Sequence, residues 1–386
     1  GIPYMDHAET DLNPQYERGT LREVYEKIGL DIEEGIPLLD DTSYSVAKYH
    51  FNYKAACCFA SRYYLFIQDW DNAIKYATKV LTSNPESLLR DYDAIAALPN
   101  SSSRHQAYVS SSSTANFLLQ AATSNSGLLF DWYSTAGRYS HGKIQGTYET
   151  VQPKKGGPWG SGVSFKAAHA VLSTSGKYVL PRTWRVFQYT DPVAGTGYNK
   201  AVSVLFCTEE ALLNRAEAYI MKMSEDPDAV NSALADMNLY ASNLFSAGFK
   251  PMTEASIRKW TTETYPNYSE LYIGKTSTNS PQTLNPKKKL HAAPYNALEE
   301  GGAQENMLQA LIFMRRYQFL HEGMRWFDTR RFGITVYRYL LDEDDETVVQ
   351  ITDQISDENG MPDLRRALQL PADVIAAGLT PNPRNK

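Results

Sequence analysis

Apolar residues recur at helical spacing from residue 20 onward, and this pattern predicts a frame of amphipathic helices. Thr20 and Glu23 have the spacing of a capping box, in which each side chain bonds the backbone N–H of the other residue at a helix start. The apolar positions that follow are three or four residues apart and would form one stripe on a helix. They are Leu21, Val24, Tyr25, Ile28 and Ile32.

Two longer segments have the pattern of a helical hairpin, with small residues where two helices would cross. The first covers residues 44–85 and the second covers residues 208–243. Compared with the tetratricopeptide pattern of about 34 residues, several expected Tyr, Ala and Pro positions are occupied. They are Tyr64, Ala73 and Pro85 in the first hairpin, and Ala216 and Tyr219 in the second.

The predicted fold class is mainly α: tetratricopeptide-like helical hairpins forming a right-handed scaffold, with a loop-rich insertion containing short strands. One repeat cannot bury its own apolar face, and about three stacked repeats are needed. We expect residues 21–39 and 304–331 to supply the remaining helices. We also expect a single domain over residues 1–386, with helical repeats at about 20–85, 208–243 and 304–331.

Between the hairpins, residues 99–201 have a different composition, rich in Ser, Gly, Pro and aromatic residues. Alternating pieces at 177–180 (KYVL) and 183–189 (TWRVFQY) predict short strands within these loops. Residues 261–303 form a second loop-rich segment. Loops held by a rigid scaffold are where binding groups usually lie, so we expect the ligand site in the insertion.

Residues 313–333, FMRRYQFLHEGMRWFDTRRFG, combine apolar positions with an unusual density of Arg and carboxylate groups. These charges cannot all reach water if the aromatic residues among them are buried, so some must pair internally, as the planar fork of Arg allows. We predict a structural ion-pair network here, with a bend or close approach at Gly323. HEGMR begins like a zinc-binding HExxH, but Arg325 replaces the second His, so no zinc site is expected.

The same segment closely resembles the C-terminal signature of the SusD/RagB family, an R-R-x-E-L-x-x-E-G-x-R-x-x-D-x-R-R pattern. Gln318 stands where this pattern has Glu, so one ion pair of the family's network is missing or replaced. Residues 369–371 (QLP) and 382–383 (NP) resemble the family's terminal segment. The matching signature positions are Arg315, Arg316, Glu322, Gly323, Arg325, Asp328, Arg330 and Arg331.

The resemblance implies a surface-exposed lipoprotein of the outer membrane of Bacteroidetes-type bacteria, which captures glycans or, in some members, peptides. Such proteins lie over a SusC-like TonB-dependent transporter, bind their ligand and hand it over without catalysis. The first residues of the chain resemble a stretch that lies well inside SusD-like proteins, so the resemblance predicts that the first third of a typical member is missing. An N-terminal lipid anchor would then lie outside this chain.

Composition and charge limit the kinds of molecule that this chain is expected to bind. The 386 residues carry 38 Lys and Arg against 44 Asp and Glu, a formal net charge of −6 that disfavours nucleic-acid binding. The basic block at residues 287–289 is expected to be a solvated loop. No apolar run approaches the ~20 residues that span a bilayer. Three cysteines suggest no disulfide framework, and we expect no cofactor and no metal.

Candidate ligand residues follow from the aromatic content, because the chain has 26 tyrosines. Exposed Tyr and Trp rings offer a flat apolar face with a polar edge, which suits stacking on sugar rings or peptide groups. Packing within the loops is the competing interpretation for each ring. We predict a stacking platform with polar groups that hydrogen-bond the ligand. Its rings are Trp132, Tyr133, Tyr139 and Trp159, and its polar groups are Arg138 and Asn125.

No catalytic motif stands out. A serine nucleophile would need a G-x-S-x-G elbow, which is absent from the sequence. The sequence does not show whether two carboxylates lie at the separation needed for glycoside cleavage, because that distance depends on the fold. We therefore predict non-catalytic binding of an oligo- or polysaccharide and its delivery to the transporter. The alternatives are a peptide-binding member of the same family, a helical glycoside hydrolase or lyase, and a repeat-based protein–protein adaptor.

Overall fold

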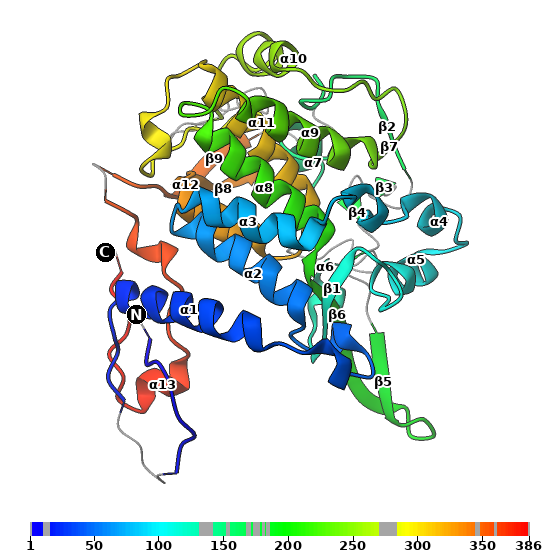
Figure 1. The fold of residues 1–386 in the computed structure, drawn as a ribbon, viewed down its shortest axis with the longest axis vertical. Helices are drawn as coiled ribbons and strands as arrows, with labels where there is room; N and C mark the ends of the chain where they lie inside the picture. The colour runs from blue at the N-terminus through cyan, green and yellow to red at the C-terminus, as the bar shows by residue number, and fades with distance from the viewer. Residues whose placement is uncertain are drawn as a thin grey trace.

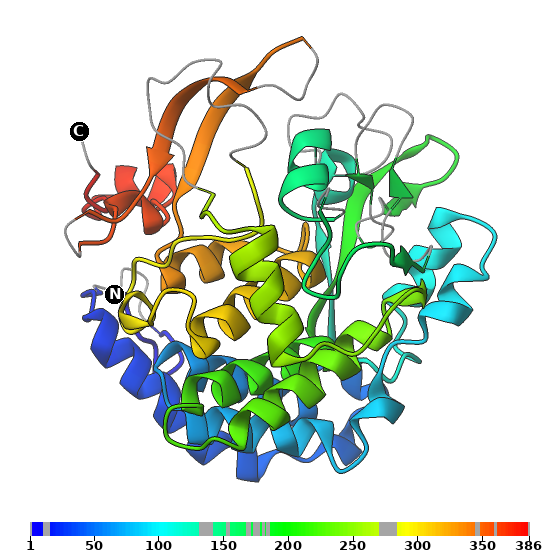
Figure 2. The same ribbon diagram turned by 90° about the horizontal axis from the view of Figure 1, so that it is seen from above.

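A stack of helices forms the frame of the computed structural model, and the longer strands project from it in two groups. Seen from above, most of the helices fill one half of the molecule, and the two groups of strands lie apart on the other half, each with a short helix beside it (Figure 2). The structure describes residues 2–10, 16–130, 142–151, 155–166, 171–172, 178–179, 182, 186–269, 284–343, 348–358 and 361–384.

The helices follow the order drawn in Figure 1, with a π-helical turn at Trp260–Thr264 directly after α10. They are α1 (Leu21–Gly35), α2 (Tyr53–Phe66), α3 (Trp70–Leu81), α4 (Tyr92–Ala96), α5 (Ser101–Tyr108), α6 (Ser126–Phe130), α7 (Lys143–Tyr148), α8 (Thr208–Lys222), α9 (Ala229–Ser242), α10 (Glu254–Lys259), α11 (Ala303–Gln318), α12 (Met324–Phe332) and α13 (Ala372–Ala376). The mainly α prediction is confirmed.

Both predicted hairpins form, as the pairs α2–α3 and α8–α9. The alanines at the helix crossings make the close approach possible, because Ala55, Ala60, Ala73 and Ala77 are completely buried. Helix α3 packs against α8, and α8 packs in turn against α9 and α11, so the two hairpins and the signature helix form one continuous stack (Figure 1). The Thr20–Glu23 capping box predicted at the start of α1 is also present.

The signature segment forms two helices, α11 and α12, instead of one. Helix α11 ends at Gln318, and Gly323 adopts a left-handed conformation with φ of 82° just before α12 begins. An L side chain rarely adopts that backbone angle, so glycine allows the chain to turn here at little cost. The bend predicted at Gly323 is therefore confirmed.

Among the described residues, the strands pair within four small antiparallel sheets, the largest in the order β1–β6–β5. Their bounds are β1 (Asn116–Thr123), β2 (Ser164–Phe165), β3 (Val171–Leu172), β4 (Tyr178–Val179), β5 (Val186–Asp191), β6 (Thr196–Cys207), β7 (Phe245–Ala247), β8 (Val336–Leu341) and β9 (Val348–Ile355). The insertion thus contains a longer strand than expected, since β6 runs for 12 residues directly into α8.

The β8–β9 hairpin was not anticipated from the sequence. It pairs β8 with β9 in antiparallel register, with Val336 opposite Ile355 and Leu341 opposite Val348. Leu284, Val348 and Ile351 form a small buried cluster beneath it, separate from the main core. Tertiary packing therefore stabilises this hairpin, and its sequence shows only a weak alternation.

The basic block at residues 287–289 was wrongly predicted to be a solvated loop. Lys287 and Lys288 are only 2% and 7% exposed. The Lys287 ammonium lies 4.5 Å from the centroid of the Tyr268 ring, and Lys288 forms an ion pair with Glu149. Buried ammonium groups need such partners, and neither partner is near the block in sequence.

Candidate ligand-binding site

The β5–β6 hairpin carries an exposed aromatic face at the edge of the three-stranded sheet. Phe187 and Tyr189 are two residues apart on β5, so their side chains lie on the same face. Their ring centroids are 4.9 Å apart with planes inclined at 75°, an edge-to-face arrangement, and Tyr189 is 58% exposed. The flat face of such a ring can stack on the apolar face of a sugar.

Two side-chain amides lie beside these rings. Asn199 is the ladder partner of Phe187, which places both side chains on one face of the sheet. Its Nδ2 donates to Asn125 Oδ1 at 3.0 Å, and this bond holds the Asn125 side chain on that face. Within the described residues, Asn125 Nδ2 and Asn199 Oδ1 have no protein partner, so a donor and an acceptor remain for a ligand. We call Asn125, Phe187, Tyr189 and Asn199 the hairpin platform.

The residue opposite Tyr189 leaves its ring uncovered. That residue is Gly197, and a Cβ at this position would lie 2.1 Å from the carbonyl oxygen of Gln188. A side chain there would collide with the backbone of β5. Glycine therefore keeps the space across the ladder from Tyr189 free.

The opposite face of the same hairpin carries a second tyrosine, which is as exposed as Tyr189 but lies beside a lysine. Tyr198 is the ladder partner of Gln188, so it lies on the face opposite Tyr189, and it is 57% exposed. Lys200 shares that face, and its ammonium lies 5.9 Å from the Tyr198 ring centroid while donating to Thr123 Oγ1 at 2.8 Å. The two tyrosines thus allow the two faces to be tested separately.

Of the two predicted ligand residues that the structure describes, Asn125 lies at the platform and Trp159 does not. Asn125 is exposed and contributes the amide described above. Trp132, Tyr133, Arg138 and Tyr139 lie outside the described residues, so their role in binding stays a prediction.

Trp159 was predicted to be an exposed stacking ring, and this prediction is wrong. Its side chain is only 6% exposed and packs edge-to-face against Phe245 and Phe313, at centroid distances of 5.1 and 5.4 Å. Phe165 completes the contact from β2 at 5.9 Å. The ring therefore anchors the insertion in the helical core, because rings from β7 and α11, far away in sequence, pack against it.

Phe187, Tyr189 and Asn199 were missing from the predicted site, although the sequence held a signal for two of them. The alternation in TWRVFQY places Phe187 and Tyr189 on one side of any strand formed there. The sequence did not reveal the register that brings Asn199 beside Phe187, nor which face stays open to solvent. Both depend on how β6 pairs with β1 and β5.

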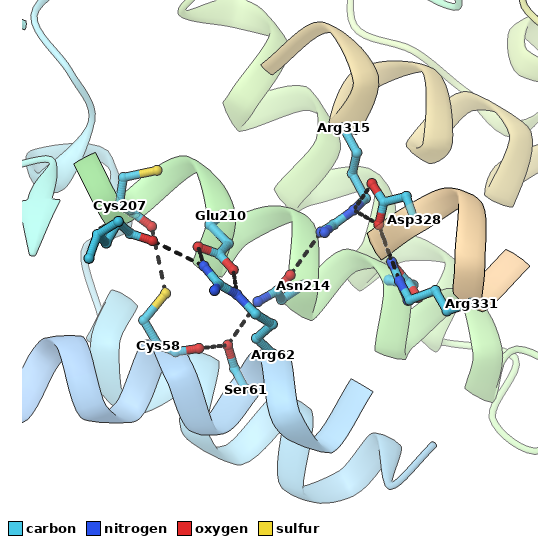
Figure 3. Close-up of polar contacts among 11 residues, drawn as sticks. Cys58, Ser61, Arg62, Cys207, Glu210, Asn214, Arg315, Asp328 and Arg331 are labelled. Atoms are coloured by element: carbon cyan, nitrogen blue, oxygen red, sulfur yellow. Dashed lines mark hydrogen bonds and ion pairs between the residues drawn. The ribbon is translucent and has the colours of Figure 1, made fainter. Parts of the chain in front are cut away.

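A buried ion lattice connects the signature segment to the helical hairpins, as Figure 3 shows. Arg315 Nε donates to both carboxylate oxygens of Asp328 at 3.2 Å, and its Nη1 donates to Asn214 Oδ1 at 2.8 Å. The Asn214 amide in turn donates to Ser61 Oγ at 3.0 Å. These bonds join α11 and α12 to α8, and α8 to α2.

The lattice continues through Arg331, whose guanidinium bonds both carboxylate oxygens of Glu217 on α8 and also reaches Asp328 Oδ1 at 3.0 Å. Burial alone would raise the pKa of Asp328, but the guanidiniums of Arg315 and Arg331 hold it below its ordinary value. Asp328 therefore stays charged between two cations. The predicted structural network of the signature is present at these positions.

The signature also binds the insertion, through Glu149 just after α7. Arg316 Nη2 donates to Glu149 Oε2 at 2.8 Å, and Lys288 Nζ donates to Glu149 Oε1 at 2.7 Å. Burial would raise the pKa of Glu149, but these two cations hold it well below its ordinary value. Burial lowers the pKa of Lys288 to about 8, although Glu149 opposes the shift. The carboxylate thus fastens the insertion to α11 and to the loop before it.

A second contact with the insertion lies at the bend between α11 and α12. Tyr108 donates to Glu322 Oε1 at 3.0 Å, and Arg182 Nη1 lies 3.9 Å from the same oxygen while donating to the carbonyl of Gln318. Burial raises the pKa of Glu322 to about 6, with Arg182 opposing. Gln318 is completely buried, and neither atom of its side-chain amide has a hydrogen-bond partner. This is the position where the signature pattern has Glu.

Two signature arginines do not take part in the predicted pairing. Arg325 matches the signature, but Asp328 is bonded by Arg315 and Arg331, and Arg325 Nη1 is buried without a hydrogen-bond partner. Burial lowers the pKa of Arg325 to about 9, with Arg316 adding to the shift. Arg330 is exposed on the outer side of α12.

The hairpin platform offers stacking and hydrogen bonding, because its four side chains are a phenyl ring, a phenol and two amides. Over the described ranges, no group of three or more His, Cys, Asp or Glu side chains is placed to hold a metal ion. No helix among the described residues is long and apolar enough to cross a membrane. The arrangement suits binding.

Comparison with known proteins identifies the architecture. Residues 1–65 match the SusD-like family described as "Starch-binding associating with outer membrane". Over 99% of its length the chain superposes on a SusD-like protein from Bacteroides fragilis, with a TM-score of 0.54 and 15% identity. The chain has a SusD-like fold. This confirms the resemblance seen in the signature segment.

Two further SusD-like structures agree. The full length of this chain superposes on a SusD superfamily protein from Bacteroides thetaiotaomicron, with a TM-score of 0.53 and 15% identity. It also superposes over its full length on a SusD superfamily protein from Bacteroides vulgatus, with a TM-score of 0.52 and 18% identity. The chain spans 75% of the B. fragilis protein, 71% of the B. thetaiotaomicron protein and 70% of the B. vulgatus protein. No curated protein sequence matches the chain.

Proposed function

We propose that this SusD-like chain binds glycans without catalysis and that the hairpin platform contacts the ligand. The observation that carries the proposal is the exposed Tyr189 ring with its edge-to-face partner Phe187. Beside these rings, Asn125 Nδ2 and Asn199 Oδ1 have no protein partner among the described residues. Sugars present an apolar ring face and a rim of hydroxyls, so a ring flanked by amides matches both.

The similarity to known proteins supports this proposal. The matched family is described as starch-binding and as associating with the outer membrane. We therefore infer that the chain acts at the outer membrane as a surface-exposed lipoprotein and passes its ligand to a SusC-like TonB-dependent transporter. Neutral glycans suit the platform better than charged ligands, because none of its side chains carries a charge.

The buried ion lattice supports the proposal in a different way. Rigid placement of binding groups lowers the entropy lost on binding. Glu149 and Arg182 fasten the insertion to the signature helices, and β6 passes directly into α8. The hairpin platform is thus held by the helical frame and not by a free loop.

The test measures retention of soluble polysaccharides, starch and other neutral glucans included, by affinity electrophoresis and calorimetry. We expect Tyr189→Ala to weaken binding of the retained glycan by roughly tenfold, the order of one lost stacking contact. Tyr198→Ala removes an equally exposed ring from the opposite face and should leave affinity unchanged. Equal losses in both variants, or none in either, would move the site away from the platform.

A turnover assay on the same glycans separates binding from catalysis. We expect no increase in reducing ends or unsaturated products during prolonged incubation. Cleavage that disappears when one Asp or Glu is changed would replace this proposal with a glycoside hydrolase or lyase. Retention of peptides in place of glycans would indicate the peptide-binding alternative, and retention of neither would favour the adaptor.

A further inference from the structure

A continuous apolar groove runs along α1. It consists of three successive hollows with volumes of about 360, 260 and 440 Å³. Neighbouring hollows share lining side chains, because Ile28 and Phe59 belong to the first two, and Tyr25, Phe66 and Phe327 belong to the last two. The shared residues show that the hollows form one groove, which we call the α1 groove.

Among the described residues, α1 is attached to the helical stack through α2 and α3, and Tyr4 of the N-terminal segment also bonds Asp31. Tyr63 donates to the carbonyl of Tyr25 at 2.7 Å, and Gly29 is so close that a Cβ there would lie 2.5 Å from the Tyr63 hydroxyl oxygen. Further along, Tyr76 donates to Glu33 Oε1 at 2.8 Å. These contacts fix α1 against α2 and α3, and the groove follows the junction of α1 and α2, where Phe59 and Phe66 of α2 line it.

Apolar side chains along the groove are exposed to a degree that is unusual for a solvent-facing surface. Phe51 at one end is 46% exposed, and Phe327 in the middle is 43% exposed. At the other end Leu364 is 42% exposed and Met361 70%. Single exposed apolar residues are ordinary, but a line of them around a hollow marks an interaction surface.

The charges at the two ends of the groove are opposite. Asp31 lines the first hollow and Arg330 lines the last, and both side chains are exposed. The last turn of α1, next to the first hollow, adds to the negative charge at that end through exposed Glu33 and Glu34, whereas Arg22 and Glu23 offset each other in the first turn. A two-fold rotation about the middle of the groove therefore places each end of one copy against the oppositely charged end of the other.

We propose that the α1 groove is an isologous interface between two copies of this chain, with the α1 helices of the two copies antiparallel across it. In this arrangement Asp31 of each copy faces Arg330 of the other, so the charge match occurs twice. The antiparallel helices also place opposite ends of their dipoles together. Phe327 lies in the shared middle of the groove, close to the symmetry axis.

Sedimentation velocity over a concentration series tests the apolar part of the interface. The parent should form a dimer, and Phe327→Asp should shift it to monomer. Val193→Asp is the matched control, because Val193 is 98% exposed in the β5–β6 turn and should leave the dimer intact. A parent that stays monomeric at about 100 μM, a concentration where even weak specific dimers form, overturns the proposal. So does a dimer that Phe327→Asp leaves unchanged.

Reversing the charges at the two ends of the groove tests the two-fold arrangement without changing an apolar residue. Asp31→Arg and Arg330→Asp should each weaken the dimer by roughly tenfold or more, because each creates two like-charge contacts. An equimolar mixture of the two variants should recover the parent affinity, as should the double variant, since both restore opposite charges. Failure of both to recover overturns the arrangement. Tyr4→Phe removes only the bond that Tyr4 donates to Asp31 and should leave the dimer intact.

Discussion

Arg315 and Asp328 form an ion pair between α11 and α12 in which both side chains are almost completely buried. Arg315 Nε lies 3.2 Å from each carboxylate oxygen, and the two side chains are 0% and 1% exposed. The pair spans the bend at Gly323, so it fixes α12 relative to α11. Because both charges have lost their water, removal of one leaves the other without compensation.

We expect Arg315→Ala to lower the free energy of unfolding by about 3–5 kcal/mol, since Asp328 and Asn214 both lose a buried donor. Urea denaturation followed by circular dichroism measures this change. Lys259→Ala at the end of α10 is the control, because its side chain is exposed away from the lattice and its loss should cost less than about 0.5 kcal/mol. Equal stabilities of the two variants would mean that the signature charges are solvated.

Glu149→Gln should destabilise the protein at neutral pH by about 3 kcal/mol, because Lys288 and Arg316 lose their shared buried carboxylate. The pKa of Glu149 is depressed in the folded state, so its contribution is complete above its ordinary value of 4.5 and is lost as the pH falls below it. The difference in unfolding free energy between parent and variant should therefore shrink below pH 4.5.

Glu300→Gln is the matched control for that experiment. Glu300 pairs with Lys289 at 3.6 Å, and both side chains are well exposed, so we expect almost no change in stability. A difference in unfolding free energy between the parent and Glu149→Gln that stays the same at every pH would contradict the prediction that Glu149 is charged and paired in the folded protein.

Gln318→Met should raise the free energy of unfolding by about 1–3 kcal/mol. The substitution keeps the volume of a completely buried side chain and removes two polar atoms that have no partner. Gln309→Met on the same helix should do the opposite, because its amide donates to the Lys288 carbonyl at 2.6 Å and accepts from the Lys288 N–H at 3.0 Å. Thermal unfolding of both variants gives the comparison, and a destabilised Gln318→Met would contradict the argument.

Trp159→Ala should lower stability by about 3–5 kcal/mol, as expected when a large core ring is removed. Trp132→Ala, in contrast, should weaken glycan retention and leave the thermal midpoint nearly unchanged. Calorimetry and affinity electrophoresis measure both effects. A strongly destabilised Trp132→Ala with unaltered binding would assign that ring to the core instead.

Features that depend on neighbours close in sequence were predictable. The Thr20–Glu23 capping box and the stripe of α1 follow from residues within a few turns of one another. The hairpins α2–α3 and α8–α9 follow from small residues at fixed offsets. The signature was correctly predicted to pair internally, because a mixture of aromatic and charged residues in one helix leaves few other solutions.

The identity of individual partners was not predictable when those partners lie far apart in the chain. Glu149 meets an arginine 167 residues away, and Asn125 bonds an amide 74 residues away. The same limit explains the wrong expectations for Trp159 and for the lysines at 287 and 288. Composition shows that a ring or a charge is present, but only the packing of distant segments decides whether it meets solvent, a counter-ion or nothing.

The sequence by itself thus determined the helical frame and the presence of a paired charge network, because helix periodicity and capping act over a few residues. The tertiary structure decided which rings are exposed and which face of β5–β6 is open. It also decided that an apolar groove follows the junction where α1 packs on α2. These properties depend on register and crossing geometry, which arise only when segments separated by tens to hundreds of residues pack together.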